Sequence, residues 1–171
     1  TQEHMRVFPS HPYRLFFLLA LGCLFGQMDW AAATPRLKIT DGNYAELLIL
    51  PKLSGDPRAH VLATRKESKA SPNDVALRLR LARNLMVIKD YTDAIDVLKT
   101  LNSEVEPRAL ILLERVYELN SDWLEQIRTL EILRKRFPQL SITASRLSTA
   151  FFKSGNTKKA VEALREGIKS S

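Results

Sequence analysis

Residues 75–168 carry the same pattern of apolar and small residues three times. The second copy begins at Pro107, 32 residues after the first begins at Val75, and the third begins 34 residues later, at Ser141. Self-similarity at a period of about 20 to 50 residues is typical of proteins built from stacked repeats. Each unit of such an array buries its apolar surface against its neighbours, so this period constrains the fold more than any other feature of the chain.

Each copy predicts two helices joined by a tight turn. In the first copy, apolar residues at three- and four-residue spacing form one helical stripe before Lys89, and a second stripe runs from Tyr91 to Leu101. Asp90 stands where it can cap the second helix, and Gly155 of the third copy can take the left-handed conformation that ends a helix. We therefore expect an all-α fold, an α-solenoid of helix-turn-helix repeats over residues 73–171, with repeats at 75–106, 107–140 and 141–171.

The three copies resemble the tetratricopeptide repeat family. That family has small residues at repeat positions eight, twenty and twenty-seven, an aromatic residue at eleven and Pro at thirty-two, and the small residues let paired helices approach closely. The residues that match are Ala82 and Ser148 at eight, Tyr117 and Phe151 at eleven, Ala94 and Ala160 at twenty, Gly167 at twenty-seven, and Pro138 at thirty-two. The resemblance covers about 95 of the 171 residues.

The second repeat departs from the family pattern at two positions. Glu114 and Gln126 stand where the family has small residues. Because neither polar side chain would be buried without a partner, we expect the two to face each other and to share a hydrogen bond.

Residues 1–33 have the anatomy of a secretory signal peptide. Arg6 and Arg14 form a positive region, residues 15–25 are apolar, and residues 31–33 offer small side chains for cleavage after Ala33. The apolar run is too short to span a bilayer, so no stable membrane span is expected after cleavage. Two alternatives stay open, namely an uncleaved anchor or buried helix, and a lipid attached to Cys23.

The chain that would follow cleavage has little material for catalysis. Residues 34–171 hold no cysteine, one histidine (His60) and no Asn-x-Ser/Thr acceptor, which favours a bacterial periplasmic protein, or a secreted one. A nucleophilic triad would have to rest on His60, no cluster of zinc ligands is visible, and no glycine-rich phosphate loop is present. We therefore expect no enzyme, with no catalytic residue, no metal and no cofactor.

Residues 34–72 read as a helical lead-in. A short helix is expected over residues 44–50, ended by Pro51, and a second helix from Arg58 to Ala70, with Asp56 as its cap and Pro57 at its first position. Residues 41–72 would then form either a degenerate fourth repeat or a capping helical hairpin.

The basic character of the chain indicates a partner-binding surface. The net charge is +7, and the expected signal peptide carries equal numbers of acidic and basic residues, so its removal leaves that charge unchanged. The resemblance implies that the first helix of each repeat lines a concave groove. The groove residues are then Leu79, Arg80, Arg83, Arg108, Ile111, Arg115, Arg146, Phe152 and Lys153.

Arginine beside apolar surface suits a protein or peptide partner with an acidic or C-terminal segment. The simpler interpretation is that these arginines are ordinary solvated helix residues. Nucleic acid is not expected, because the basic residues are mixed with acidic ones and form no long run. An anionic surface, such as envelope polysaccharide or lipid head groups, stays open.

Together these features predict a non-catalytic protein–protein interaction scaffold of the cell envelope. The alternative is a structural accessory subunit of an envelope enzyme, or of a secretion, pilus or polysaccharide assembly complex. In that case the partner would use the open ends of the array, which could also join copies into an oligomer.

Overall fold

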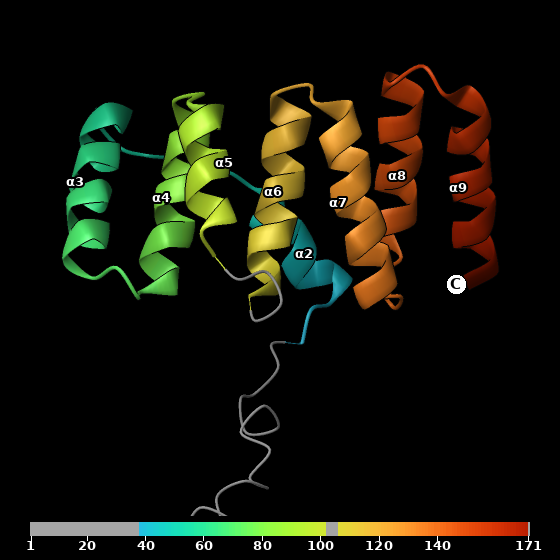
Figure 1. The fold of residues 1–171 in the computed structure, drawn as a ribbon, viewed down its shortest axis with the longest axis horizontal. Helices are drawn as coiled ribbons and strands as arrows, with labels where there is room; N and C mark the ends of the chain where they lie inside the picture. The colour runs from blue at the N-terminus through green and yellow to red at the C-terminus, as the bar shows by residue number, and fades with distance from the viewer. Residues whose placement is uncertain (1–37, 102–105, 171) are drawn as a thin grey trace, which may run out of the picture. The chain divides into compact units, whose positions relative to one another are not determined.

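The computed structural model describes residues 38–101 and 106–170, and these residues form eight α-helices and no strand (Figure 1). This confirms the predicted all-α solenoid. The expected signal peptide, residues 1–33 with Cys23, lies outside the described residues. Within the described ranges no helix combines the length and the apolar character that a membrane crossing needs. In chain order the helices are α2 (Asp41–Leu48), α3 (Pro57–Ala70), α4 (Val75–Val87), α5 (Tyr91–Lys99), α6 (Pro107–Leu119), α7 (Trp123–Arg136), α8 (Ile142–Lys153) and α9 (Thr157–Ser170).

Helices α3 to α9 stack in sequence order. Each of them packs against the next one along the chain, and they stand side by side in Figure 1. Helices α4 and α6, the first helices of two successive pairs, also touch each other. Such nearest-neighbour packing is what makes a repeat array, because every helix pair covers the apolar surface of the pair before it.

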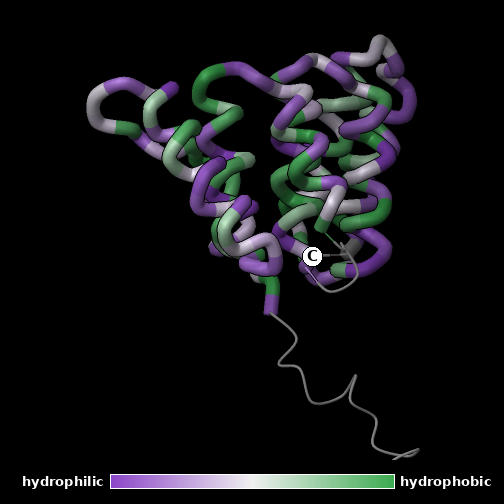
Figure 2. The backbone as a smooth tube through the Cα atoms, turned by 60° about the vertical axis from the view of Figure 1, so that its left-hand side comes forward, coloured by the Kyte–Doolittle hydropathy of each residue, from purple (hydrophilic) through white to green (hydrophobic). Residues whose placement is uncertain are grey.

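The helices begin where side chains can cap them. Asp56 accepts a hydrogen bond from the Arg58 amide at 3.0 Å, and Pro57 is the first residue of α3, as predicted. Asp90 caps α5 by accepting from the Asp93 amide at 3.4 Å, also as predicted. Figure 2 shows hydrophobic and hydrophilic residues alternating along the helices, which lets each helix turn one face inward.

The buried side chains form two clusters. One lies around α4, α5 and α6 and includes Val61 of α3, Leu85 and Leu98. The other joins α6, α7, α8 and α9 and includes Leu130 and Leu147. The approach of α9 to α8 is close at Gly167, where an added Cβ would lie 2.5 Å from the Cβ of Ala144. The small residue expected at that repeat position is therefore required by packing.

The lead-in differs from both predicted forms. Helix α2 packs against α6, whereas α3 packs against α4. Residues 49–56 join them without helical structure, and α2 ends at Leu48 rather than Leu50. Since the two helices of a repeat or a hairpin pack against each other, residues 41–72 form neither. The physical reason is that α2 carries Tyr44, which is fully buried and belongs to the cluster of α6 to α9.

The turn inside each repeat uses the same backbone conformation. Lys89, Ser121 and Gly155 occupy equivalent places, and all three have positive φ angles, of 63°, 58° and 85°. A side chain in this left-handed region costs roughly 1–2 kcal/mol, and glycine avoids that cost.

We therefore expect Ser121→Gly to raise the free energy of unfolding by about 0.5–1 kcal/mol, and Gly155→Ala to lower it by about 1 kcal/mol. Chemical denaturation of the two variants beside the parent measures both changes. Ser154→Gly, one residue earlier and at negative φ (−78°), is the matched control and should not stabilise. If Ser121→Gly and Ser154→Gly behave alike, the left-handed turn is not what the substitution relieves.

Candidate partner-binding groove

The N-terminal segment of the described chain lies across the face formed by α4, α6 and α8. We call residues 38–53 the crossing segment. At its start, Gln139 donates to the Ile39 carbonyl at 3.4 Å, and Asp41 accepts from the Ser141 hydroxyl at 2.8 Å. At its other end, Arg83 of α4 donates to the Ile49 carbonyl at 2.5 Å. The segment therefore runs from the start of α8 to α4, over the surface predicted as an open groove.

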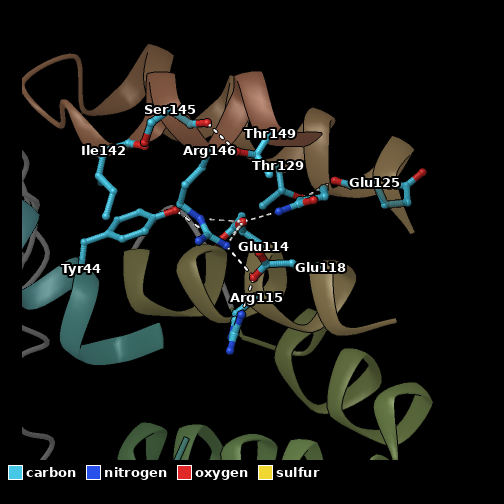
Figure 3. A network of polar contacts seen from close by, with 11 residues as sticks. Tyr44, Glu114, Arg115, Glu118, Glu125, Thr129, Ile142, Ser145, Arg146 and Thr149 are labelled. Atoms are coloured by element: carbon cyan, nitrogen blue, oxygen red, sulfur yellow. Dashed lines mark hydrogen bonds and ion pairs between the residues drawn. The ribbon is translucent and has the colours of Figure 1, made fainter. Parts of the chain in front are cut away.

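Tyr44 anchors the middle of the crossing segment. Its ring is fully buried, and its hydroxyl donates to Oε2 of Glu114 at 3.3 Å. In Figure 3 the ring reaches from α2 toward the space between α6 and α8, with Ile142 beside it. Ile111, predicted to line the groove, is also fully buried and belongs to the same apolar cluster as Tyr44. This part of the predicted groove is thus filled by the chain itself.

Glu114 is a fully buried carboxylate that four donors surround (Figure 3). Its Oε1 accepts from Gln126 Nε2 at 2.6 Å, which confirms the predicted hydrogen bond between these two residues. The same oxygen accepts from Nε and Nη2 of Arg146 at 3.0 and 2.6 Å. Arg146 Nη2 also donates to Glu118 at 2.8 Å, and Arg115 donates to that same carboxylate. We call these residues, with Tyr44, the polar network.

Burial and charge act against each other in the polar network. Burial raises the pKa of the Glu114 carboxyl, although the charge and hydrogen bonds of Arg146 oppose it. Burial, followed by the Glu114 charge, also raises the pKa of the Tyr44 hydroxyl, so that Tyr44 is a neutral donor. For Arg146 burial works against the cation, but Glu114 and Glu118 more than offset it and raise its pKa. Burial is likewise outweighed at Glu118, where hydrogen bonds from Arg146 hold the pKa below its usual range.

A hollow of about 550 Å³ stays open beside the crossing segment. It contains four of the predicted groove residues, namely Leu79, Arg80, Arg83 and Arg108. Residues outside the predicted groove set complete its wall: Leu47, Pro51 and Leu53 from the crossing segment, His60, Ala63, Thr64 and Glu67 from α3, and Ala76, Asn84 and Leu112.

The three arginines of the hollow differ in their partners. Arg80 forms an ion pair with Glu67 of α3. Arg108 binds Glu106 through two hydrogen bonds of 2.6 Å, and these bonds raise its pKa against the effect of burial. Arg83 instead donates to the Ile49 carbonyl, and its Nε is buried without a hydrogen-bond partner among the described residues. Arg83 therefore has the least compensated cation of the three.

The remaining predicted residues do not line the hollow. Arg115 and Arg146 belong to the polar network, and Arg146 keeps 16% of its side-chain area exposed. Phe152 is 63% exposed at the end of α8, with Lys153 exposed beside it. Repeat position correctly assigned these residues to first helices, but it could not show that the crossing segment would divide them.

The described residues define an α-solenoid of paired helices, the class of helical-repeat proteins. Among solved structures, the chain is similar to MamA, residues 41 to the end, from Desulfovibrio magneticus RS-1, with a TM-score of 0.59, 20% identity, and coverage of 92% of this chain and 93% of that one. It is also similar to the ArsTM double mutant of MamA RS-1, with a TM-score of 0.57, 20% identity and the same coverage. This likeness concerns the fold. The sequence matches no protein-family model and no curated protein.

Removing Arg146 should strongly destabilise the fold. Arg146→Met leaves the fully buried Glu114 without its cationic partner, and breaking a buried pair in this way costs about 3–5 kcal/mol. The matched control is Arg65→Met, because Arg65 pairs with Asp93 while both side chains are about 40% exposed, and such a pair contributes less than about 1 kcal/mol. Denaturation in urea measures both losses. Equal losses would show that the burial of Glu114 does not depend on Arg146.

The contribution of Glu118 should depend on pH. Its pKa is lower in the folded chain than the usual 4.5, so the ionised form stabilises the fold above that pH, and the benefit disappears as the pH falls through the folded-state pKa. Glu118→Gln should therefore cost stability at about pH 6, and this cost should shrink as the pH falls below 4.5. Denaturation curves of parent and variant at several pH values test this, with the exposed Glu131→Gln on α7 as control. A cost that stays constant over this range would contradict it.

Proposed function

We propose that this chain is a non-catalytic interaction scaffold of the tetratricopeptide type that works in the cell envelope and holds a segment of a partner protein in the hollow. The observation that carries the proposal is the hollow itself. Its volume of about 550 Å³ lies within the range of roughly 300–1,000 Å³ that is usual for binding sites. It combines apolar walls with a few polar groups, as binding sites do.

The lining favours a partner segment with a carboxylate beside an aliphatic side chain. Leu79, Leu112 and Leu53 supply apolar surface, and Arg83 supplies a guanidinium that donates to a backbone carbonyl and forms no ion pair among the described residues. A guanidinium binds a carboxylate through two parallel hydrogen bonds, which fixes its orientation as well as its position. The ion pair between Arg80 and Glu67 can be replaced by one with such a partner at a small cost in free energy, because both side chains of the pair are 53% exposed.

The envelope location rests on the sequence of residues 1–33. A positive region, an apolar run and small residues before position 34 are the features that an export machinery reads. The tetratricopeptide assignment rests on the repeat pattern, to which the capped helix pairs add support.

A second function, that of an accessory subunit assembled through an end of the array, is favoured by α9. Val161, Leu164 and Ile168 are exposed by 43%, 46% and 78%. No helix of the described residues covers them, and an uncovered repeat face needs a polar surface or a partner.

Neutralising the arginines of the hollow separates these functions. Arg80→Gln with Arg83→Gln removes two charges and keeps a side chain that can donate to the Ile49 carbonyl. We expect the partner retained from an envelope extract to bind this variant about tenfold or more weakly, since charged anchors dominate such interfaces. Quantitative mass spectrometry of retained proteins, followed by titration of the purified partner, provides the measurement.

The control is Arg128→Gln with Lys135→Gln, which removes the same charge from exposed positions on α7. It should leave the affinity unchanged. If the partner binds both double variants as it binds the parent, the hollow is not its site, and the accessory role through α9 is supported instead.

A further inference from the structure

The crossing segment contacts the groove in the way that a bound peptide would. Its main chain is held at two points, the carbonyls of Ile39 and Ile49, by side chains of the repeat array. Between them lies one capped helix, α2, with a single buried aromatic side chain. Helix-in-groove recognition uses the same elements, namely an amphipathic helix with apolar anchors at three- and four-residue spacing. Here those anchors are Tyr44, Leu47 and Leu48.

The stacking contacts of the repeat array run between its own helices. Contacts between successive helices run without a break from α3 to α9, and α2 lies outside that series: it packs on α6 and meets the start of α8 through Asp41. Residues 49–56 tether α2 to α3 as non-helical chain, with Lys52, Ser54, Gly55 and Asp56 exposed. A helix of eight residues is unstable in water by itself, so α2 would unfold on leaving the groove. Release therefore leaves a stacked array with an open central face.

We propose that residues 38–53 are a resident ligand of the groove, and that a partner segment of the same chemistry displaces them to reach the central face. This proposal rests on the proposed function and specifies the chemistry of the partner segment. The displacing segment is a short amphipathic helix with a tyrosine that reaches Glu114, aliphatic residues three and four positions later, and extended chain whose carbonyl meets Arg83. Tyr44 confers the specificity, because its hydroxyl meets a fully buried carboxylate (Figure 3).

The test uses the full chain and a labelled synthetic peptide of residues 38–53 as the probe. Cys23→Ser, Asp41→Cys and Ser141→Cys together place one cysteine on α2 and one before α8, where the native side chains are 2.8 Å apart. Oxidation then locks the crossing segment in place, and reduction frees it, so that the same molecule is its own control. Titration of free thiols verifies the lock.

We expect the reduced chain to bind the peptide at least about tenfold more tightly than the oxidised chain, because a site that is mostly occupied in cis has a proportionally lower apparent affinity. The same peptide with Tyr44→Ala should bind the reduced chain at least about tenfold more weakly than the native peptide. Equal binding in both redox states, or no binding in either, would overturn the proposal.

A second variant, Tyr44→Ala in the full chain, weakens the crossing segment and leaves Glu114, Arg146 and Arg83 in place. It should bind the native peptide about tenfold more tightly than the parent does, with the helical circular dichroism of α3 to α9 retained. Affinity no higher than that of the parent, in a chain that keeps its helices, would count against a resident ligand. If this variant unfolds, the comparison of the oxidised and reduced chains still tests the proposal.

The outcome is separable from that of the proposed function. Binding of the peptide by the reduced chain, with no partner lost on neutralising Arg80 and Arg83, would uphold the resident ligand and overturn the hollow as a partner site. A partner that the oxidised and reduced chains capture equally, and that is lost when Arg80 and Arg83 are neutralised, would uphold the hollow as a partner site and overturn the resident ligand.

Discussion

The buried carboxylate of Glu114 is the constraint on which this arrangement depends. A charge without solvent must be matched by donors, and its donors come from three different helices: Tyr44 of α2, Gln126 of α7 and Arg146 of α8. These bonds fix how α6 meets α2, α7 and α8. They also hold α2 against the array, because no other group supplies the donor to Oε2 of Glu114 among the described residues. One buried acid therefore joins the repeat stack to the segment that crosses it.

This arrangement gives the first-helix face two different surfaces. Its centre is apolar and already covered, with Ile111 fully buried beneath the crossing segment. Next to it, toward α3, lies the open hollow, whose wall is partly made by the same segment through Leu47, Pro51 and Leu53. Any movement of residues 38–53 must therefore change both surfaces together. In the proposed scaffold, binding in the hollow is coupled to occupancy of the central face through this shared wall, because each state of the segment presents a different surface to a partner.

The sequence predicted what local pattern and pairing rules determine. The helix starts at Pro57 and Tyr91, the left-handed turn at Gly155 and the hydrogen bond between Glu114 and Gln126 all follow from spacing within a single repeat. The position of the crossing segment could not be predicted, because Tyr44 and Glu114 are 70 residues apart in the sequence. The pattern of a short helix does not indicate which distant residue accepts its hydrogen bond. For the same reason Arg115 and Arg146 were expected in an open groove. Repeat position gives the face of a helix, but not the segment that later covers it.

The internal carboxylates limit what the net positive charge of the chain can contribute to binding. Despite the net charge of +7, Arg80, Arg108 and Arg146 each lie beside a glutamate of the same chain. The binding free energy that an acidic partner gains at these arginines is only the difference between its own ion pair and the internal ion pair that it replaces. Charge by itself therefore yields little affinity at these positions. Under the proposed function, selectivity rests on the groups whose present contacts are incomplete or exchangeable, which are Arg83 and the site of Tyr44. The proposed partner segment satisfies both the Arg83 guanidinium and the buried Glu114, whereas a merely acidic peptide satisfies only the guanidinium.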